Sequence, residues 1–345
     1  MKTNANSQQT MPRPYYREAS VLFLFVSFFC FSEAQGFHDL EILDCKGCHG
    51  LKKSAPSSVC LHCHAEKFRV LSKTGNAYTP GGDFFWLNNQ YSVGQSLGDG
   101  NSHGHNVLAD EFDLQTDALL PSAPSDGKVK YLAAWMSCTS CHDPHQSTAF
   151  PGKGYRLLGG TDYNGGKKTV KFKFKFPSPV ARPSERDYED WRPESDANHA
   201  DYRTGMSEWC SNCHSGYTSN PSLSHAAGAK ALFGDIAQNY NSYDVRRNAF
   251  DFLIPFERGA MDDEATSKDI TAGPNSSSNV ICLSCHRSHA SAFSNIGRWD
   301  FKVEFLANSP ILAITEGAHA FYGQSITARY GRKQKTLCNK CHSKG

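Results

Sequence analysis

Six copies of one short pattern, Cys-x-x-Cys-His, account for 12 of the 13 cysteines in this 345-residue chain. Two thiols at this spacing can add to the two vinyl groups of a haem, and the histidine that follows supplies an axial nitrogen to the iron. Cys-x-x-Cys pairs also bind zinc, but a zinc site does not need histidine directly after the second cysteine. The sequence therefore predicts six covalently bound haem c groups, with zinc as the alternative. The predicted attachment sites are Cys45, Cys48, Cys60, Cys63, Cys138, Cys141, Cys210, Cys213, Cys282, Cys285, Cys338 and Cys341.

Each motif also supplies one proximal iron ligand, the histidine at its fifth position. Nine further histidines remain for the six opposite faces, whereas residues 37–345 contain three methionines. Two imidazoles on every iron leave no open site for a substrate, which favours electron transfer over catalysis. The predicted proximal ligands are His49, His64, His142, His214, His286 and His342.

Several of the remaining histidines are placed to bind the distal face of a haem. His145 and His289 each follow a motif histidine by three residues, which is too close to reach round the same haem, so we expect each to bind a neighbouring haem. In the loop after the second motif we expect His105, rather than His103, to bind iron. His225, after the fourth motif, offers another imidazole.

Residues 1–36 have the pattern of a secretory signal, which does not belong to the folded protein. Basic residues precede an apolar run at 21–31 that is too short to span a bilayer, and small residues follow at Ala34 and Gly36. We therefore expect a chain without a membrane span, exported through the periplasm and secreted to the extracellular space or cell surface. Residues 37–345 are expected to form a single hexahaem c-type cytochrome domain.

The positions of the elements follow from the motifs. Because motifs recur from residue 45 to residue 342, most segments would lie against a porphyrin, and haem would form much of the apolar core. The sequence predicts a multihaem cytochrome c, mostly coil, with short helices around the motifs and few strands wrapped around a linear haem stack. Strict alternation of Lys and Phe at 170–176 predicts a half-buried strand. Residues 290–330 are expected to be helical in part.

Charge excludes one class of partner. The formal net charge is +2 at pH 7, and no basic cluster stands out, so nothing supports binding to nucleic acid. The propionates of six haems would make the loaded protein acidic.

Blocks of sequence along the whole region from residue 37 onward carry a family resemblance. Their order relative to the motifs matches, and stretches between motifs, such as Gly205-Met206-Ser207-Glu208-Trp209, are more specific than the motifs themselves. The chain resembles the OmcS-type filament-forming hexahaem outer-surface c-type cytochromes of metal-reducing bacteria, the extracellular cytochrome nanowires. The blocks are 37–38, 79–84, 104–106, 138–145, 155–161, 205–210, 282–291, 330–332 and 338–342.

The resemblance implies a homopolymer of subunits stacked end to end, with haems in an unbroken line of alternating parallel and T-shaped pairs. Such a filament would take electrons from upstream outer-membrane or periplasmic cytochromes and carry them to metal oxides, electrodes or partner cells. A monomeric periplasmic or cell-surface shuttle is the alternative, and a metal or nitrogen-oxide reductase is a third. The resemblance carries the distal-ligand role to His38, His105, His145, His225 and His289.

The sequence departs from the family at one ligand. Lys52 stands where the family has a histidine that binds a haem of the next subunit, three residues after the first motif. One iron is therefore left without a second imidazole. His62 lies between the cysteines of the second motif and cannot reach the distal face of that haem, so it either binds another haem or is simply exposed. We take His62 as the candidate sixth distal ligand; the other candidates are His103, His199, His319 and a neutral Lys52.

The haem count is directly testable. Intact-mass spectrometry of the exported chain should give the polypeptide without its signal plus six haems, because each attachment is covalent. Four haems or fewer, or zinc in their place, would show that the motifs have a different function.

Overall fold

A computed structural model describes twelve stretches of the chain, all within the unit Gly36–Gly345. The predicted signal, His38 and His319 lie outside these stretches. The described residues are 45–53, 55–66, 70–75, 79–87, 103–127, 130–145, 155–167, 171–184, 194–219, 225–260, 270–309 and 321–342.

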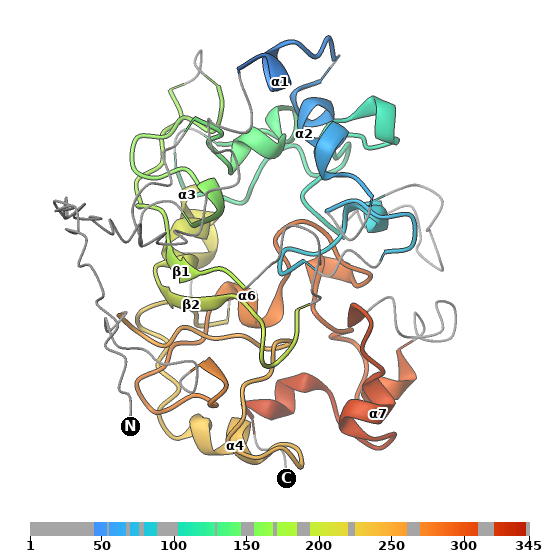
Figure 1. The fold of residues 1–345 in the computed structure, drawn as a ribbon. Helices are drawn as coiled ribbons and strands as arrows, with labels where there is room; N and C mark the ends of the chain where they lie inside the picture. Colours follow the sequence, from blue (N-terminus) through green and yellow to red (C-terminus); the bar gives the residue numbers. More distant parts are fainter. Residues whose placement is uncertain are drawn as a thin grey trace, which may run out of the picture. The chain divides into compact units, whose positions relative to one another are not determined.

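Regular structure is sparse in these stretches, as the sequence predicts (Figure 1). The longest helix, α3, has 14 residues, and the other α-helices have between 4 and 9. The α-helices are α1 (Cys45–His49), α2 (Pro56–His64), α3 (Met206–Ser219), α4 (Ile236–Ser242), α6 (Cys282–Cys285) and α7 (Ile326–Tyr330). The 3-10 turns are η1 (Phe84–Leu87), η3 (Asp110–Phe112), η4 (Ala133–Trp135), η5 (Cys138–Ser140), η6 (Tyr155–Leu157), η7 (Ser294–Ile296), η8 (Leu306–Asn308) and η11 (Leu337–Lys340).

Each of the six motifs lies on one of these helical turns, namely α1, α2, η5, α3, α6 and η11. Helical residues three and four apart are neighbours on one face, so a turn aligns the two cysteines and the following histidine of a motif. A serine before the second cysteine fixes two of the turns. The Ser140 hydroxyl accepts a hydrogen bond from the Ser137 backbone N–H at 2.8 Å, and Ser284 accepts one from Ile281 at 3.0 Å. The predicted helices around the motifs are therefore confirmed.

The single sheet of the described residues pairs β1 (Val180–Arg182) with β2 (Asp201–Thr204) in antiparallel register. Ala181 lies opposite Tyr202. Gly205, at φ +86°, then turns the chain from β2 into α3, and it adopts this left-handed conformation without the strain of a side chain. The sheet thus sets the start of the helix that carries the fourth motif.

The alternating segment 171–176 is only partly as predicted. Phe172 and Phe174 are buried and the lysines between them are exposed, which confirms the two-sided pattern. The segment is not in a sheet, because its backbone pairs with a turn. Phe174 donates to the Tyr163 carbonyl and accepts from the Asp162 N–H. Periodicity reports which side chains are buried and does not by itself supply a partner strand.

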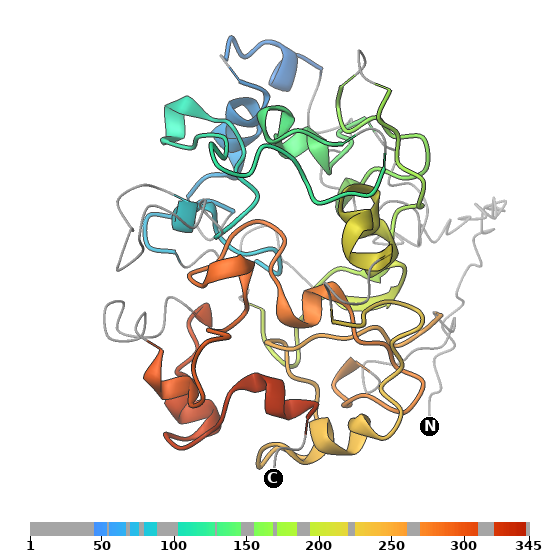
Figure 2. The ribbon, with the colours of Figure 1, turned by 180° about the vertical axis from the view of Figure 1, so that it is seen from behind.

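Motif turns pack on one another or on the core. Helix α2 contacts η5, α3 contacts α6, and α4 contacts η11 (Figures 1 and 2). Within the described stretches, none of the helices has the length and hydropathy needed to cross a lipid bilayer.

An aromatic cluster forms the core behind α4. The ring of Phe256 lies 5.4–5.6 Å from the rings of Phe233, Tyr240 and Phe250, and the Arg258 guanidinium lies 4.7 Å above it. Phe256 is 1% exposed. The cluster is part of a larger protein core, against which the motif residues Cys285, Cys338 and Cys341 pack.

The cluster predicts a large effect of Phe256→Ala. Removing a fully buried ring should lower the free energy of unfolding by about 3–5 kcal/mol. Val245→Ala, at a side chain that is 92% exposed, is the control and should change it by no more than about 0.5 kcal/mol. Urea denaturation of the haem-loaded protein measures both, and equal effects of the two variants would contradict this placement of the core.

Candidate haem sites

Four motif histidines face a second histidine from a distant part of the chain. An ion that binds two imidazoles from opposite sides, at about 2 Å each, places their ring centroids about 6 Å apart. The four pairs have nearly that spacing and therefore fit one metal ion each. The centroid distances are 6.1 Å for His49–His145, 6.2 Å for His142–His289, 5.8 Å for His214–His105 and 5.7 Å for His342–His225.

The pairing crosses between motifs. His145 follows the third motif but faces His49 of the first, with the two rings nearly parallel at 6°. His289 follows the fifth motif but faces His142 of the third. The contacts thus run from one motif to another, as the three-residue spacing in the sequence predicts.

Several predicted ligand histidines are oriented by a hydrogen bond at one ring nitrogen, which leaves the other nitrogen for a metal ion. A metal-binding histidine usually donates its other ring N–H to a carbonyl, which fixes the tautomer and leaves Nε2 as the ligand atom. Four predicted ligands have their Nδ1 at hydrogen-bond distance from a backbone carbonyl. The pairs are His142 with Arg156 (2.7 Å), His105 with Ser288 (2.7 Å), His286 with Asn295 (2.7 Å) and His225 with Ala226 (2.8 Å).

Burial keeps the inner imidazoles neutral. Desolvation, followed by the charges of neighbouring histidines, lowers the pKa of both His214 and His289 to about 3. Desolvation also lowers the pKa of His105 and His286. The neutral imidazole is the form that binds a metal, so these sites suit iron at neutral pH without first losing a proton.

The remaining predicted ligands have different surroundings. His286, in the fifth motif, has an edge-to-face contact with Phe301 at 5.6 Å. His62 is exposed on α2. His103 faces the Ser291 carbonyl at 3.0 Å, and His199 is buried in the core, stacked 3.6 Å from Phe250.

The cysteines of successive motifs approach one another in sequence order. The Cys138 backbone N–H donates to the Ser57 hydroxyl on α2 at 3.3 Å, which links motif 3 to motif 2, and the Cys282 N–H donates to the Ser207 hydroxyl on α3 at 3.0 Å, which links motif 5 to motif 4. In the other three pairs of successive motifs, burial raises the pKa of one cysteine, and the negative charge of cysteines in the neighbouring motif raises it further. They are Cys48 with Cys60 and Cys63, Cys213 with Cys141, and Cys285 with Cys341 and Cys338. Cofactors attached at these sulfurs would follow one another along the chain.

Comparison with known proteins gives the family. The sequence is 30% identical to the C-type cytochrome OmcS of Geobacter sulfurreducens, over 90% of this chain and 95% of the relative. The chain belongs to the OmcS family of c-type cytochromes. Its members are multihaem electron-transfer proteins, which agrees with the repeated motifs and with the paired imidazoles.

Two solved structures from Geobacter sulfurreducens have a similar fold. The outer membrane cytochrome S filament matches with a TM-score of 0.62 and 30% identity, over 85% of this chain and 90% of that chain. The OmcS nanowires, solved by electron cryomicroscopy, match with a TM-score of 0.65 and 26% identity, over 87% and 98%. No family model matches the sequence.

The surroundings of the fifth motif fit the haem that the OmcS family implies. Arg298 is 2% exposed and donates to the carbonyls of Leu283 and His286 in that motif. Its Nη2, the indole Nε1 of Trp299 and the Nε of Arg287 are buried without hydrogen-bond partners. All three are hydrogen-bond donors, and a haem propionate is a negatively charged acceptor. Sequence reasoning missed these residues, although Arg287 directly follows the motif.

The zinc alternative has no matching site in the described stretches. Within them, no three His, Cys, Asp or Glu side chains converge as ligands of one metal ion. The histidine pairs described above instead combine one motif histidine with one histidine from elsewhere.

The His49–His145 contact predicts the effect of His145→Ala. One iron should become high-spin in electron paramagnetic resonance, while all covalent haems remain by mass. The affected iron should be that of motif 1, because His145 faces His49. In a Cys45→Ala/Cys48→Ala background, which lacks that haem, the same substitution should add no high-spin signal. A new signal in that background would assign His145 to another haem.

Proposed function

We propose that this chain is an extracellular electron conduit that binds six haems, each with two histidine ligands, and polymerises into a filament. Bound haem supplies reversible one-electron transfer. The observation that supports this best is the pairing of four motif histidines with histidines from distant segments, with 5.7–6.2 Å between the ring centroids. The likeness to a filament and to nanowires of the OmcS family supports the polymer.

The histidine pairs of the first and sixth motifs are exposed and the histidines of the inner pairs are half-buried, which suits conduction between subunits. His49, His145, His225 and His342 are exposed, and these form the pairs of the first and sixth motifs. His289, from an inner pair, is half-buried, and desolvation lowers its pKa to about 3. Electrons would therefore enter and leave at the two ends.

The proposed ligand roles follow the contacts. The six motif histidines bind the proximal faces, and the twelve motif cysteines hold the haems. His145, His289, His105 and His225 bind the distal faces of the haems at motifs 1, 3, 4 and 6. His38 and His62 complete the set at motifs 2 and 5. Because His62 cannot reach the distal face at its own motif, we assign it to motif 5 of a neighbouring subunit.

A monomeric periplasmic or surface shuttle is the second candidate function. The presence of Lys52, where the family has an inter-subunit histidine, favours it. An enzyme would need an open axial position, and six irons with two imidazoles each offer none. Proposed partners are a second copy of the chain, upstream cytochromes and extracellular acceptors.

Electron microscopy of the secreted protein tests the proposal. Filaments with six low-spin irons per chain support the conduit, and a monomer with six low-spin irons supports the shuttle. His62→Ala should shorten or abolish filaments and leave one high-spin iron, because it removes the ligand between subunits. The control is Lys73→Ala, also at an exposed side chain, which should change neither property. Intact filaments and six low-spin irons in His62→Ala would exclude His62.

A further inference from the structure

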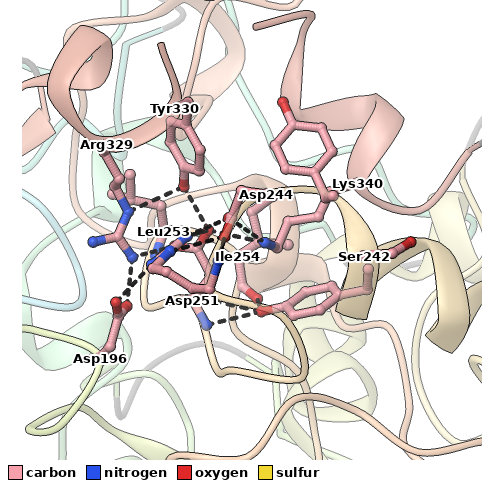
Figure 3. A network of polar contacts seen from close by, with 12 residues as sticks. Asp196, Ser242, Asp244, Asp251, Leu253, Ile254, Arg329, Tyr330 and Lys340 are labelled. Carbon is pink, nitrogen blue, oxygen red and sulfur yellow. Dashed lines mark hydrogen bonds and ion pairs between the residues drawn. The ribbon is translucent and has the colours of Figure 1, made fainter.

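A cluster of buried charges surrounds one residue of the sixth motif (Figure 3). Lys340 lies between the two cysteines of that motif, yet it is only 2% exposed. Three carboxylates and three cations make up the cluster, so its formal charge is balanced. Its members are Asp196, Asp244, Asp251, Arg246, Arg329 and Lys340.

Two carboxylates and two aromatic rings surround the ammonium group of Lys340. Its Nζ lies 3.3 Å from Asp244 Oδ2 and 3.2 Å from Asp251 Oδ2. The rings of Tyr240 and Tyr243 lie 4.4 and 5.1 Å from Nζ, at cation–π distance. A lysine in a haem motif is expected to be solvated, so this burial needs a reason in the site itself.

Asp251 is the centre of the cluster, with no exposed surface. It pairs with Lys340, with Arg329 at 2.8 Å and with Arg246 at 3.1 Å, and it accepts a hydrogen bond from Tyr330. Burial alone would raise the pKa of Asp251, but the three cations hold it well below its ordinary value. The carboxylate therefore stays charged.

The cluster is coupled to the turn that carries motif 6. The Asn239 amide, from α4, donates to the Cys341 carbonyl at 2.9 Å, and the Tyr243 hydroxyl donates to the Lys335 carbonyl at 2.7 Å. Lys340 directly precedes Cys341, so a haem held by this cysteine would be attached to the same turn. Because a water-poor interior screens charges weakly, the charge of Lys340 would act on that haem.

We propose that Lys340 is a positioning residue for the last haem of the chain and that the balanced charge of its cluster sets the reduction potential of that haem. This inference rests on the proposed function, because it needs a haem at motif 6. A net negative charge beside a haem stabilises the ferric state and lowers the potential, and a net positive charge raises it.

Single and double substitutions test the sign of the effect. Lys340→Met removes one positive charge, so the titration wave of one haem should shift to lower potential. Asp244→Asn removes one negative charge, so a wave should shift to higher potential. The double variant restores balance and should return the wave towards its original position, and Lys340→Arg should keep it there. Spectroelectrochemical titration of the six-haem protein measures all four.

A surface ion pair supplies the matched control. Lys173 and Asp162 are 3.4 Å apart with side chains that are 65% and 76% exposed. Lys173→Met and Asp162→Asn make the same chemical changes where water and salt screen them, so neither should shift a wave.

The outcomes separate this inference from the proposed function. A wild-type peptide that carries no haem at Cys338 and Cys341 would contradict the proposed function. A haem at this site whose potential is unmoved, or moves in the same direction in both single variants, would overturn the charge-balance inference alone. Should Lys340→Met fail to fold, the upward shift in Asp244→Asn and its reversal in the double variant still test the sign, and equal shifts in these two variants would overturn the inference.

Discussion

The geometry of a single helical turn constrains most of this structure. Cysteines three apart and a histidine one residue further share one helical face, so a motif presents two sulfurs and a nitrogen together. Among the described elements, four of the six α-helices carry a motif, and the 3-10 turns η5 and η11 carry the other two. Between them the chain has little need of long helices, because its task is to bring one motif turn beside the next. The contacts α2 with η5 and α3 with α6 achieve this for successive motifs.

Different groups compensate the buried charges at motifs 5 and 6. Around motif 6, three cations meet three carboxylates, and Lys340 is compensated by Asp244 and Asp251. Beside motif 5, Arg298 has no carboxylate at ion-pair distance among the described residues, and burial lowers its pKa to about 10. An uncompensated buried guanidinium is costly. A haem propionate would remove that cost, so the two sites differ in whether protein or cofactor supplies the negative charge.

Local features of the fold could be predicted from the sequence, and non-local ones could not. Motif spacing predicts the helical turns, and the Lys–Phe alternation predicts the burial of Phe172 and Phe174. The contact of His49 with His145 depends on a long intervening segment, and spacing showed only that His145 must face another motif. The burial of Lys340 could not be predicted either, because the carboxylates that compensate it come from residues 244 and 251, far from it in the sequence.

The order of the irons is the central claim of this account. A density map of the haem-loaded protein, by electron cryomicroscopy, would show it directly. The account predicts that the irons follow one another in the order of the six motifs, with the first and sixth at the two ends of the line. A branched arrangement, or a line in which motif 3 is not between motifs 2 and 4, would contradict it.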